Sequence, residues 1–141
     1  MLVRCLYASR AVKPLTQHTV DTILDQSRRN NPKRGITGML VMSDEVFIQV
    51  LEGGRDAVCD LYNTIVQDPR HTGVRLLMFD EITERRFGHW TMGHVNTAKV
   101  NGSLLLKYSE KATLNPFDAP GAATMALLNE LVATAAIVNR N

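Results

Sequence analysis

Gln49 is a polar side chain inside a segment that otherwise predicts a buried strand. Residues 46–51 read Val-Phe-Ile-Gln-Val-Leu, and Gln49 shares one strand face with Phe47 and Leu51. Its amide has two donor hydrogens and an acceptor oxygen, and burying it without partners costs about 1–3 kcal/mol. The residues alone leave two choices: a backbone or tyrosine partner in a polar core network, or a bound ligand.

Tyr7 is a second polar group among apolar neighbours, between Leu6 and Ala8 on a predicted first strand. A strand tyrosine is usually a packed aromatic whose hydroxyl reaches the edge of the core, and that interpretation is favoured. The first and third strands of the fold predicted below are neighbours, however. Tyr7 and Gln49 can therefore meet inside the protein.

Two adjacent amides, Asn30 and Asn31, stand at the predicted end of the first helix. Asparagine is an ordinary helix C-cap residue, and this role is favoured. The alternative is that these amides pair with the carbonyl and imide groups of a planar heterocycle. The same stretch also carries four cations within seven residues, namely Arg28, Arg29, Lys33 and Arg34. Such a cluster predicts either a solvated surface or a phosphate-binding patch.

Two further pairs of residues have both an ordinary and a functional interpretation. Arg70 and His71 follow the second predicted helix, where they suit either a phosphate group or the negative end of the helix dipole. Trp90 and Met92 lie two positions apart on the predicted last strand and therefore on one face. Core packing is favoured for this second pair.

Composition excludes several classes of protein. Sixteen Lys and Arg residues against fourteen Asp and Glu residues give a net charge of +2, too balanced for a bulk polyanion binder. The three Tyr, four Phe and one Trp are too sparse for the stacking platforms of an RNA-binding sheet. The apolar runs are also too short to span a membrane. We therefore expect neither a nucleic-acid nor a membrane partner.

The sequence contains little that predicts a metal site or a hydrolase active site. No closely spaced set of Cys and His predicts a metal site, no GxSxG motif occurs, and Glu52 lacks an evident carboxylate partner. Cys5 and Cys59 fall in a predicted strand and a predicted helix. Because no secretory signal is seen, two reduced, buried thiols and a cytoplasmic location are expected.

The hydrophobic pattern predicts the order β-α-β-β-α-β-β. Strands are expected at residues 2–8, 36–42, 46–51, 74–80 and 89–95. One helix is expected to be N-capped by Thr16 and to end at residues 30–32, and a second to cover residues 57–65. Two strand–helix–strand crossovers around a hairpin give an α+β, ferredoxin-like sandwich, in which a five-stranded mixed sheet carries two helices on one face.

Residues 96–141 differ in character and are assigned to a C-terminal helical extension, separate from a domain over residues 1–95. Residues 96–102 predict a polar linker, and residues 103–111 and 122–138 predict two helices. The second of these helices is apolar over much of its circumference. We expect it to cover the second face of the sheet or another subunit.

Taken together, these residues resemble the BLUF family of blue-light sensors that use FAD. The resemblance covers residues 2–95, about two thirds of the chain. Any one of its segments would be unspecific, whereas five in the same order and spacing are highly specific. The segments are residues 6–9 (LYAS), 29–38 (from RNNP to GITG), 47–53 (FIQVLEG), 68–71 (DPRH) and 86–92 (RFGHWTM).

The resemblance implies that the flavin ring lies between the two main helices, edge-on to the sheet. Asn31 then pairs with the carbonyl edge of the ring, and Gln49 lies between the flavin and Tyr7. The remaining implied contacts are Ile23 and Ile65 on the two ring faces, Asn30 at the pyrimidine end, Ser27 as a supporting partner, and Arg70 and His71 near the ribityl-phosphate tail.

The resemblance also implies light-driven signalling and no enzymatic turnover. Tyr7 gives an electron and then a proton to the light-excited flavin with Gln49 as the relay, and the Gln49 amide ends rearranged by rotation or tautomerisation. Trp90 and Met92 then carry the signal toward the C-terminal helices. Since the residues after Val95 are too few for a cyclase or phosphodiesterase, the chain is expected to act on a separate downstream signalling protein and to form homo-oligomers.

An alternative from a different class uses the basic cluster and Asn31. In that interpretation the chain is a ferredoxin-like acyl-phosphate hydrolase, or a domain that binds a phosphate ligand. Hydrolysis of a generic acyl phosphate that is lost on Arg34→Ala distinguishes this alternative from a photoreceptor.

Overall fold

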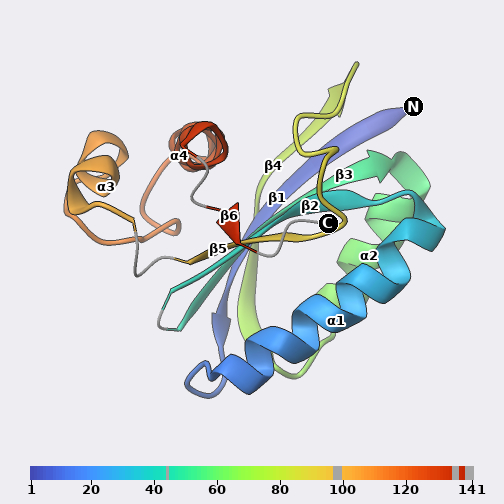
Figure 1. The fold of residues 1–141 in the computed structure, drawn as a ribbon, viewed down its shortest axis with the longest axis horizontal. Coiled ribbons are helices and arrows are strands. Elements are labelled where there is room, and N and C mark those ends of the chain that lie inside the picture. Colours follow the sequence, from blue (N-terminus) through green and yellow to red (C-terminus); the bar gives the residue numbers. More distant parts are fainter. Residues whose placement is uncertain (44, 97–99, 135–136, 139–141) are drawn as a thin grey trace.

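The fold is seen in a computed structural model that describes the chain except residues 44, 97–99, 135–136 and 139–141. Helices and strands are arranged around a single sheet (Figure 1). In chain order the elements are β1 (Leu2–Ala11), α1 (Gln17–Arg34), β2 (Thr37–Ser43), β3 (Val46–Gly54), α2 (Arg55–Val66), β4 (His71–Ile82), β5 (Gly93–Asn96), α3 (Gly102–Tyr108), α4 (Gly121–Ala133) and β6 (Ile137–Val138).

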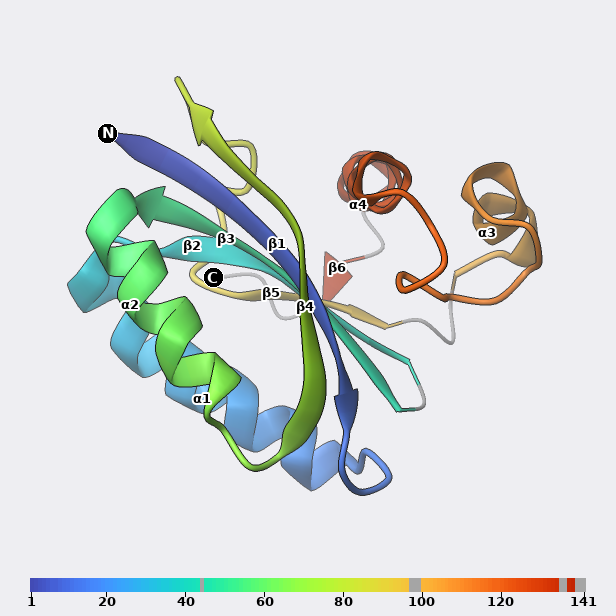
Figure 2. The same cartoon turned by 180° about the vertical axis from the view of Figure 1, so that it is seen from behind.

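The sheet has the strand order β4-β1-β3-β2-β5-β6. Its pairs are antiparallel except β2 with β5, which run parallel and make the sheet mixed. α1 and α2 lie side by side on one face, and α4 lies on the other side (Figures 1 and 2). The predicted ferredoxin-like α+β fold is confirmed, and the two-residue β6 adds a short pairing outside β5.

The register of β1 against β3 places the chemistry-bearing residues opposite each other. Tyr7 pairs directly with Gln49, and Ser9 with Phe47. Because side chains alternate along a strand, these residues share the face that α1 and α2 cover. The prediction that the first and third strands are neighbours is confirmed.

α1 begins as predicted, since the Thr16 hydroxyl accepts a hydrogen bond from the Thr19 amide at 3.2 Å. The predicted end at residues 30–32 is wrong, because the helix continues through Pro32 to Arg34. A proline near a helix end removes only one backbone hydrogen bond. Gly35, with φ of 67°, ends the helix in the left-handed conformation, and its amide donates to the Asn31 and Pro32 carbonyls. Asn30 and Asn31 are therefore inside the last turns and are not C-caps.

The predicted last strand over residues 89–95 is wrong at its start, because β5 begins at Gly93. The preceding residues form a crossover that carries the chain from the β4 edge to the far side of β2. On this segment the Trp90 carbonyl accepts a hydrogen bond from the Gly38 amide of β2 at 3.0 Å, but the residues before Gly93 form no continuous strand. Trp90 and Met92 therefore lie in a loop, where the alternation of a strand does not apply.

The C-terminal helices also differ from the prediction. α3 spans Gly102–Tyr108 and begins with Asn101, whose side chain accepts from the Ser103 amide at 2.8 Å. α4 ends at Ala133 and does not continue to residue 138. Ile137 and Val138 pair with β5 instead, as suits β-branched residues beside an open strand edge. The predicted linker at 96–102 and helix at 122–138 each lie partly outside the described residues.

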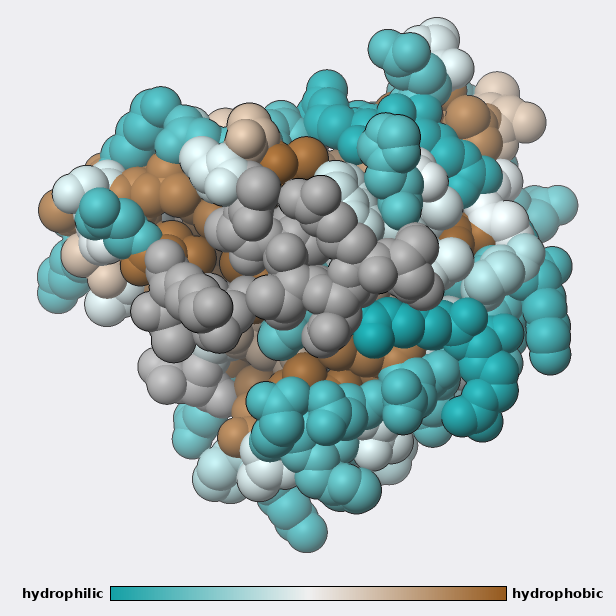
Figure 3. All heavy atoms as spheres, in the orientation of Figure 1, coloured by the Kyte–Doolittle hydropathy of each residue, from teal (hydrophilic) through white to brown (hydrophobic). Residues whose placement is uncertain are grey.

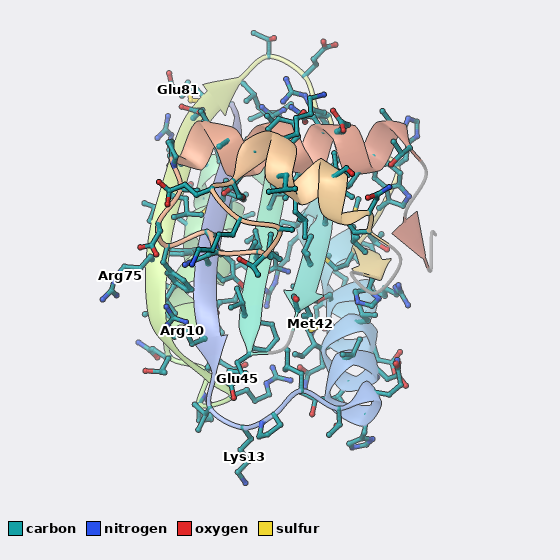
Figure 4. All side chains as sticks on the ribbon, turned by 90° about the vertical axis from the view of Figure 1, so that its left-hand side faces the viewer. Arg10, Lys13, Met42, Glu45, Arg75 and Glu81 are labelled. Carbon is teal, nitrogen blue, oxygen red and sulfur yellow. The ribbon has the colours of Figure 1, made fainter. Side chains whose placement is uncertain are left out.

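Two hydrophobic cores fill the two sides of the sheet. The core under α1 and α2, called here the helix-face core, consists of Val3, Cys5, Val20, Leu24, Ile36, Leu40, Met42, Phe47, Leu51, Val58 and Met92. The core under α4, called here the cap-face core, consists of Leu6, Ala8, Met39, Val41, Ile48, Val50, Phe87, Trp90, Val95, Met125, Leu127, Leu128 and Leu131. Figure 4 shows α4 and α3 lying across the strands on this second side.

The hydrophilic outer side of α1 and the two free cysteines are consistent with the predicted sandwich. The outward side of α1 is hydrophilic (Figure 3). Cys5 and Cys59 are both free, although only Cys5 is fully buried, and burial raises its pKa to about 12. None of the helices in the described part of the chain is long and apolar enough to cross a membrane.

Candidate functional site

A cavity of about 310 Å³ lies between α1, α2 and the helix face of the sheet. This volume is at the lower end of the range of about 300–1,000 Å³ for small-molecule sites. All the residues expected to bind a cofactor line it: Tyr7, Ile23, Ser27, Asn30, Asn31, Gln49, Ile65, Arg70 and His71. The fold thus brings them together, and their individual roles toward a ligand stay predictions.

Three buried side chains form a hydrogen-bonded line beside this cavity. The Tyr7 hydroxyl donates to Gln49 Oε1, and Gln49 Nε2 donates to Met92 Sδ over 3.4 Å. Tyr7 and Gln49 are 4% and 5% exposed, and Met92 is fully buried. The buried amide therefore has a tyrosine partner, and its second N–H, which no described residue takes, is available to a ligand in the cavity.

Burial controls the chemistry of the Tyr7 hydroxyl. It raises the pKa of Tyr7 far above its usual value, and the nearby Cys5 and Asp68 raise it further. The ring has aromatic neighbours edge-on, with centroids at 5.7 Å for Tyr62 and 6.4 Å for His71. Tyr7 is therefore a neutral phenol whose proton points at an amide oxygen.

α1 supplies one wall of the cavity through residues three or four positions apart, which share a helix face. Ser27 donates its hydroxyl to the Ile23 carbonyl at 3.0 Å, so the chain itself satisfies that donor. Asn31 is only 2% exposed, and its Nδ2 donates to the Thr91 carbonyl at 2.9 Å. Asn31 thus joins the cavity to the loop that carries Met92, while Asn30 lines the cavity from an exposed position.

α2 supplies the opposite wall with apolar side chains. Ile65 and Leu61 line the cavity across from Ile23, and all three are only partly buried. Two aliphatic walls with amides along the sheet side suit a flat ring whose faces are apolar and whose edges form hydrogen bonds. The residues present therefore fit the isoalloxazine ring of a flavin.

Arg70 and His71 are already engaged within the chain. Arg70 Nε lies 3.0 Å from each Asp68 carboxylate oxygen, and its Nη2 lies 2.5 Å from Asp68 Oδ2 and 3.1 Å from Gln26 Oε1. The Arg70 guanidinium holds the pKa of Asp68 below its usual range. His71 Nδ1 lies 2.7 Å from the Ser9 hydroxyl, and its Nε2 donates to the Ile65 carbonyl.

Glu52 has partners that the sequence did not reveal. The carboxylate is fully buried and accepts from Arg4 Nε at 2.7 Å and from the Phe87 amide at 2.6 Å. The Arg86 amide donates to both its oxygens, at 3.0 and 3.1 Å. Arg85 binds the same strand end, at the Glu52 carbonyl. Glu52 thus fastens the crossover loop to the middle of the sheet.

Several other cavity-lining residues were assigned no role from the sequence: Gln26, Leu40, Phe47, Leu61, Thr64 and Asp68. Helical spacing could have found Gln26, which belongs to the same stripe along α1 as Ile23 and Asn30. Arg34, predicted only as part of the basic cluster, continues this stripe. Asp68 could have been found from its position two residues before Arg70, a spacing at which aspartate often accepts from the backbone amide. That bond is present at 2.9 Å.

A second cavity, of about 440 Å³, lies on the other side of the sheet against α4. Its lining is largely aliphatic, with Arg10 and Glu45 among the polar exceptions (Figure 4). Arg10 stacks over the Phe117 ring at 4.1 Å. This cavity is remote from the Tyr7–Gln49 pair, and the described residues hold no cluster of three or more His, Cys, Asp or Glu that could bind a metal ion.

The comparisons with known proteins agree with this geometry. The family described as sensors of blue-light using FAD matches residues 2–93. The beta subunit of the photoactivated adenylate cyclase of Euglena gracilis is 37% identical over 92 residues, which are 64% of this chain and 11% of that subunit. The chain thus spans about a tenth of the length of this curated relative.

Two solved structures resemble the whole fold. The photo-activated state of BlsA has a TM-score of 0.81 at 30% identity, covering 100% of this chain and 99% of that one. The dark state of BlrB, a BLUF protein, has a TM-score of 0.76 at 31% identity, covering 95% and 96%. The chain therefore belongs to the BLUF family of blue-light sensors, and its cofactor is FAD.

Proposed function

We propose that this protein is a blue-light photoreceptor in which Tyr7 is the electron and proton donor and Gln49 the element that rearranges. The observation that carries the proposal is the bond from the Tyr7 hydroxyl to Gln49 Oε1 in the wall of the cavity. The same amide donates to Met92. A change at Gln49 therefore acts on two neighbours at once.

Tyr7 suits the donor role because its proton has a defined destination. When bound, the flavin supplies a chromophore that absorbs blue light and then accepts an electron. Since burial raises the pKa of Tyr7, the phenol keeps its proton until the electron leaves. The proton then moves to Gln49 Oε1, and Nε2 would release one in exchange to the flavin that has accepted the electron. The return of an electron and a proton restores the Tyr7 phenol and leaves Gln49 rearranged.

Either form of the rearranged amide disturbs its contact with Met92. Rotation turns Oε1 toward the thioether sulfur, which has no hydrogen to donate. Tautomerisation leaves the nitrogen with one hydrogen in place of two, so that it can no longer serve both Met92 and a ligand. The amide is thus a two-state element whose states differ in hydrogen bonding at almost equal volume.

We further propose that Met92 and Trp90 carry this change toward the cap-face core and α4. Residues 1–95 act as the sensor and residues 96–141 as its helical cap. The receiver is a separate downstream signalling protein, and the chain itself performs no enzymatic turnover. We also propose homo-oligomers and a cytoplasmic location.

An absorption spectrum in the dark and after blue light tests the proposal. The purified protein is expected to be yellow and to show a reversible shift of flavin absorption to the red. A colourless protein that takes up no added FAD contradicts the proposal, as does a bound flavin without the reversible shift. Hydrolysis of acetyl phosphate that is lost on Arg34→Ala would support the hydrolase alternative instead.

A further inference from the structure

The cavity of the proposed flavin site is lined by two arginines whose surroundings differ, Arg34 on α1 and Arg70 after α2. Both are cations within reach of a ligand that carries a phosphate on a flexible tail. An arginine binds a phosphate well only when its planar fork of N–H donors is free to face it. Which of the two arginines can bind a phosphate therefore depends on whether its guanidinium is already bound by other residues of the chain.

Arg70 is committed to a carboxylate of its own loop. Its Nε and Nη2 contact both oxygens of Asp68 at 2.5–3.0 Å, and Nη2 also meets Gln26. The Asp68 charge offsets the Arg70 charge and faces the same cavity, where it repels an anion. The neighbouring His71 offers no free donor, because Ser9 and the Ile65 carbonyl take its two ring nitrogens.

Arg34, in contrast to Arg70, is not held in an ion pair among the described residues. It lies in the last turn of α1, is exposed, and has no side-chain partner among the described residues. Of the four cations in its cluster it alone lines the cavity, whereas Arg28, Arg29 and Lys33 do not. The nearby Arg85 is occupied by Thr37 and by the Gly35 and Glu52 carbonyls.

We propose that Arg34, and not Arg70, receives the phosphate of the bound flavin's tail, because Asp68 holds Arg70 in an internal ion pair. This proposal rests on the proposed function, in which the cavity is the flavin site. It differs from the expectation that Arg70 and His71 serve the ribityl-phosphate tail. Asp68 and Arg70 instead bridge the α2–β4 loop to Gln26 on α1 at the cavity.

Binding of riboflavin, FMN and FAD to the apoprotein tests this assignment without any light-driven step. The three probes share the ring and the ribityl chain; FMN adds a single phosphate, and FAD adds a diphosphate with adenosine. The ratio of the riboflavin and FMN dissociation constants therefore isolates the phosphate, and FAD shows whether the adenosine changes this preference. Flavin fluorescence quenching or calorimetry gives the constants. For one partly exposed charge-assisted contact, we expect FMN and FAD to bind about three- to tenfold more tightly than riboflavin at low salt. The preference should shrink at high salt.

Matched variants separate the candidates. Arg34→Gln should remove the preference for phosphate while leaving riboflavin binding unchanged, whereas Lys33→Gln removes an equal charge from the same turn and should leave the preference intact. Arg70→Gln should change the three affinities by a common factor. Loss of the preference in Arg70→Gln but not in Arg34→Gln overturns the proposal, and so does a wild-type protein that binds all three flavins equally. Failure to bind any flavin would instead refute the proposed function itself.

Discussion

Trp90 and Met92, separated by a single residue, pack into the cores on opposite sides of the sheet. Trp90 is 6% exposed and belongs to the cap-face core, as do Met125 and Leu128 of α4. Met92 is fully buried in the helix-face core and accepts a hydrogen bond from Gln49. The short segment between them therefore connects the cavity side of the molecule to the side covered by α4.

This connection predicts that Met92→Leu separates the photochemistry from its transmission. Leucine keeps nearly the same volume, so the cost in folding free energy should stay below about 1.5 kcal/mol. It cannot accept the Gln49 N–H, however, and this amide then loses its link to the loop. We expect the red-shifted state to form while the light-dependent change in Trp90 fluorescence is lost. Trp90 is the only tryptophan, so its emission reports this site alone.

Met39→Leu is the control for the loss of a thioether near the reporter, since Met39 is as deeply buried and lies near Trp90 in the cap-face core, but makes no contact with the Gln49 amide in the described structure. It should keep the fluorescence response. An undiminished response in Met92→Leu would show that the signal reaches Trp90 by another route.

The two neighbouring tyrosines predict a second comparison. Tyr7→Phe removes the hydroxyl that donates to Gln49 Oε1, which costs about 1–3 kcal/mol if the oxygen stays unpaired. The variant should still bind flavin but form no normal red-shifted state under blue light. Tyr62→Phe removes the hydroxyl of the ring that meets Tyr7 edge-on at 5.7 Å and should keep the normal shift. Equal behaviour of the two variants would refute the assignment of Tyr7 as donor.

The sequence predicted the site well wherever regular spacing positions the residues. Tyr7 and Gln49 belong to uninterrupted strands, and their opposition follows from the order of β1 and β3. The stripe along α1 follows from helical periodicity, because 3.6 residues per turn place Ile23, Ser27 and Asn31 on one face. These contacts depend on local geometry and on one choice of strand order.

The sequence failed where irregular backbone decides the outcome. Trp90 and Met92 were expected on one strand face, but the crossover loop has no period of two and sends them to opposite sides. Glu52 showed no partner because two of its donors are backbone amides, which every residue type possesses. The pairing of Asp68 with Arg70 depends on the conformation of their loop. A separation of two residues allows this conformation but does not determine it.

The Asp68–Arg70 pair predicts a limited dependence of stability on pH. Arg70 lowers the pKa of Asp68 from its ordinary value of 3.8. A carboxyl with a depressed pKa in the folded state stabilises the fold above its unfolded pKa and loses that effect as the pH falls through its folded pKa. Because both side chains are partly exposed, at 25% and 37%, the effect should be at most about 1 kcal/mol.

Asp68→Asn should therefore be less stable than the wild type near neutral pH, and the difference should vanish as the pH falls well below 4. Urea unfolding of both proteins across this range gives the two free energies of unfolding. A difference that persists undiminished in acid would mean that the carboxylate charge is not the source of the stabilisation.

Glu52 predicts the largest loss of stability among these residues. Its carboxylate is fully buried, and its partner Arg4 has a side chain only 11% exposed. Breaking such a pair leaves a buried charge without a counter-ion, which costs about 3–5 kcal/mol. We expect Glu52→Gln to lower the free energy of unfolding by that order. Glu81→Gln, at an ion pair with Arg55 whose side chains are 62% and 44% exposed, should cost less than about 1 kcal/mol.

A double change distinguishes the ion pair from the fastening of the loop. Replacing Arg4 by Met and Glu52 by Leu removes both charges, and such a replacement of a buried pair is often neutral. Here the Arg86 and Phe87 amides still lose their acceptor, so the double variant should recover only part of the loss seen in Glu52→Gln. Urea unfolding measures how much of the free energy of unfolding the double variant regains. Hydrogen exchange at these two amides shows whether the part that is not regained comes from the loop. Full recovery with protected amides would show that the carboxylate does not hold the crossover loop.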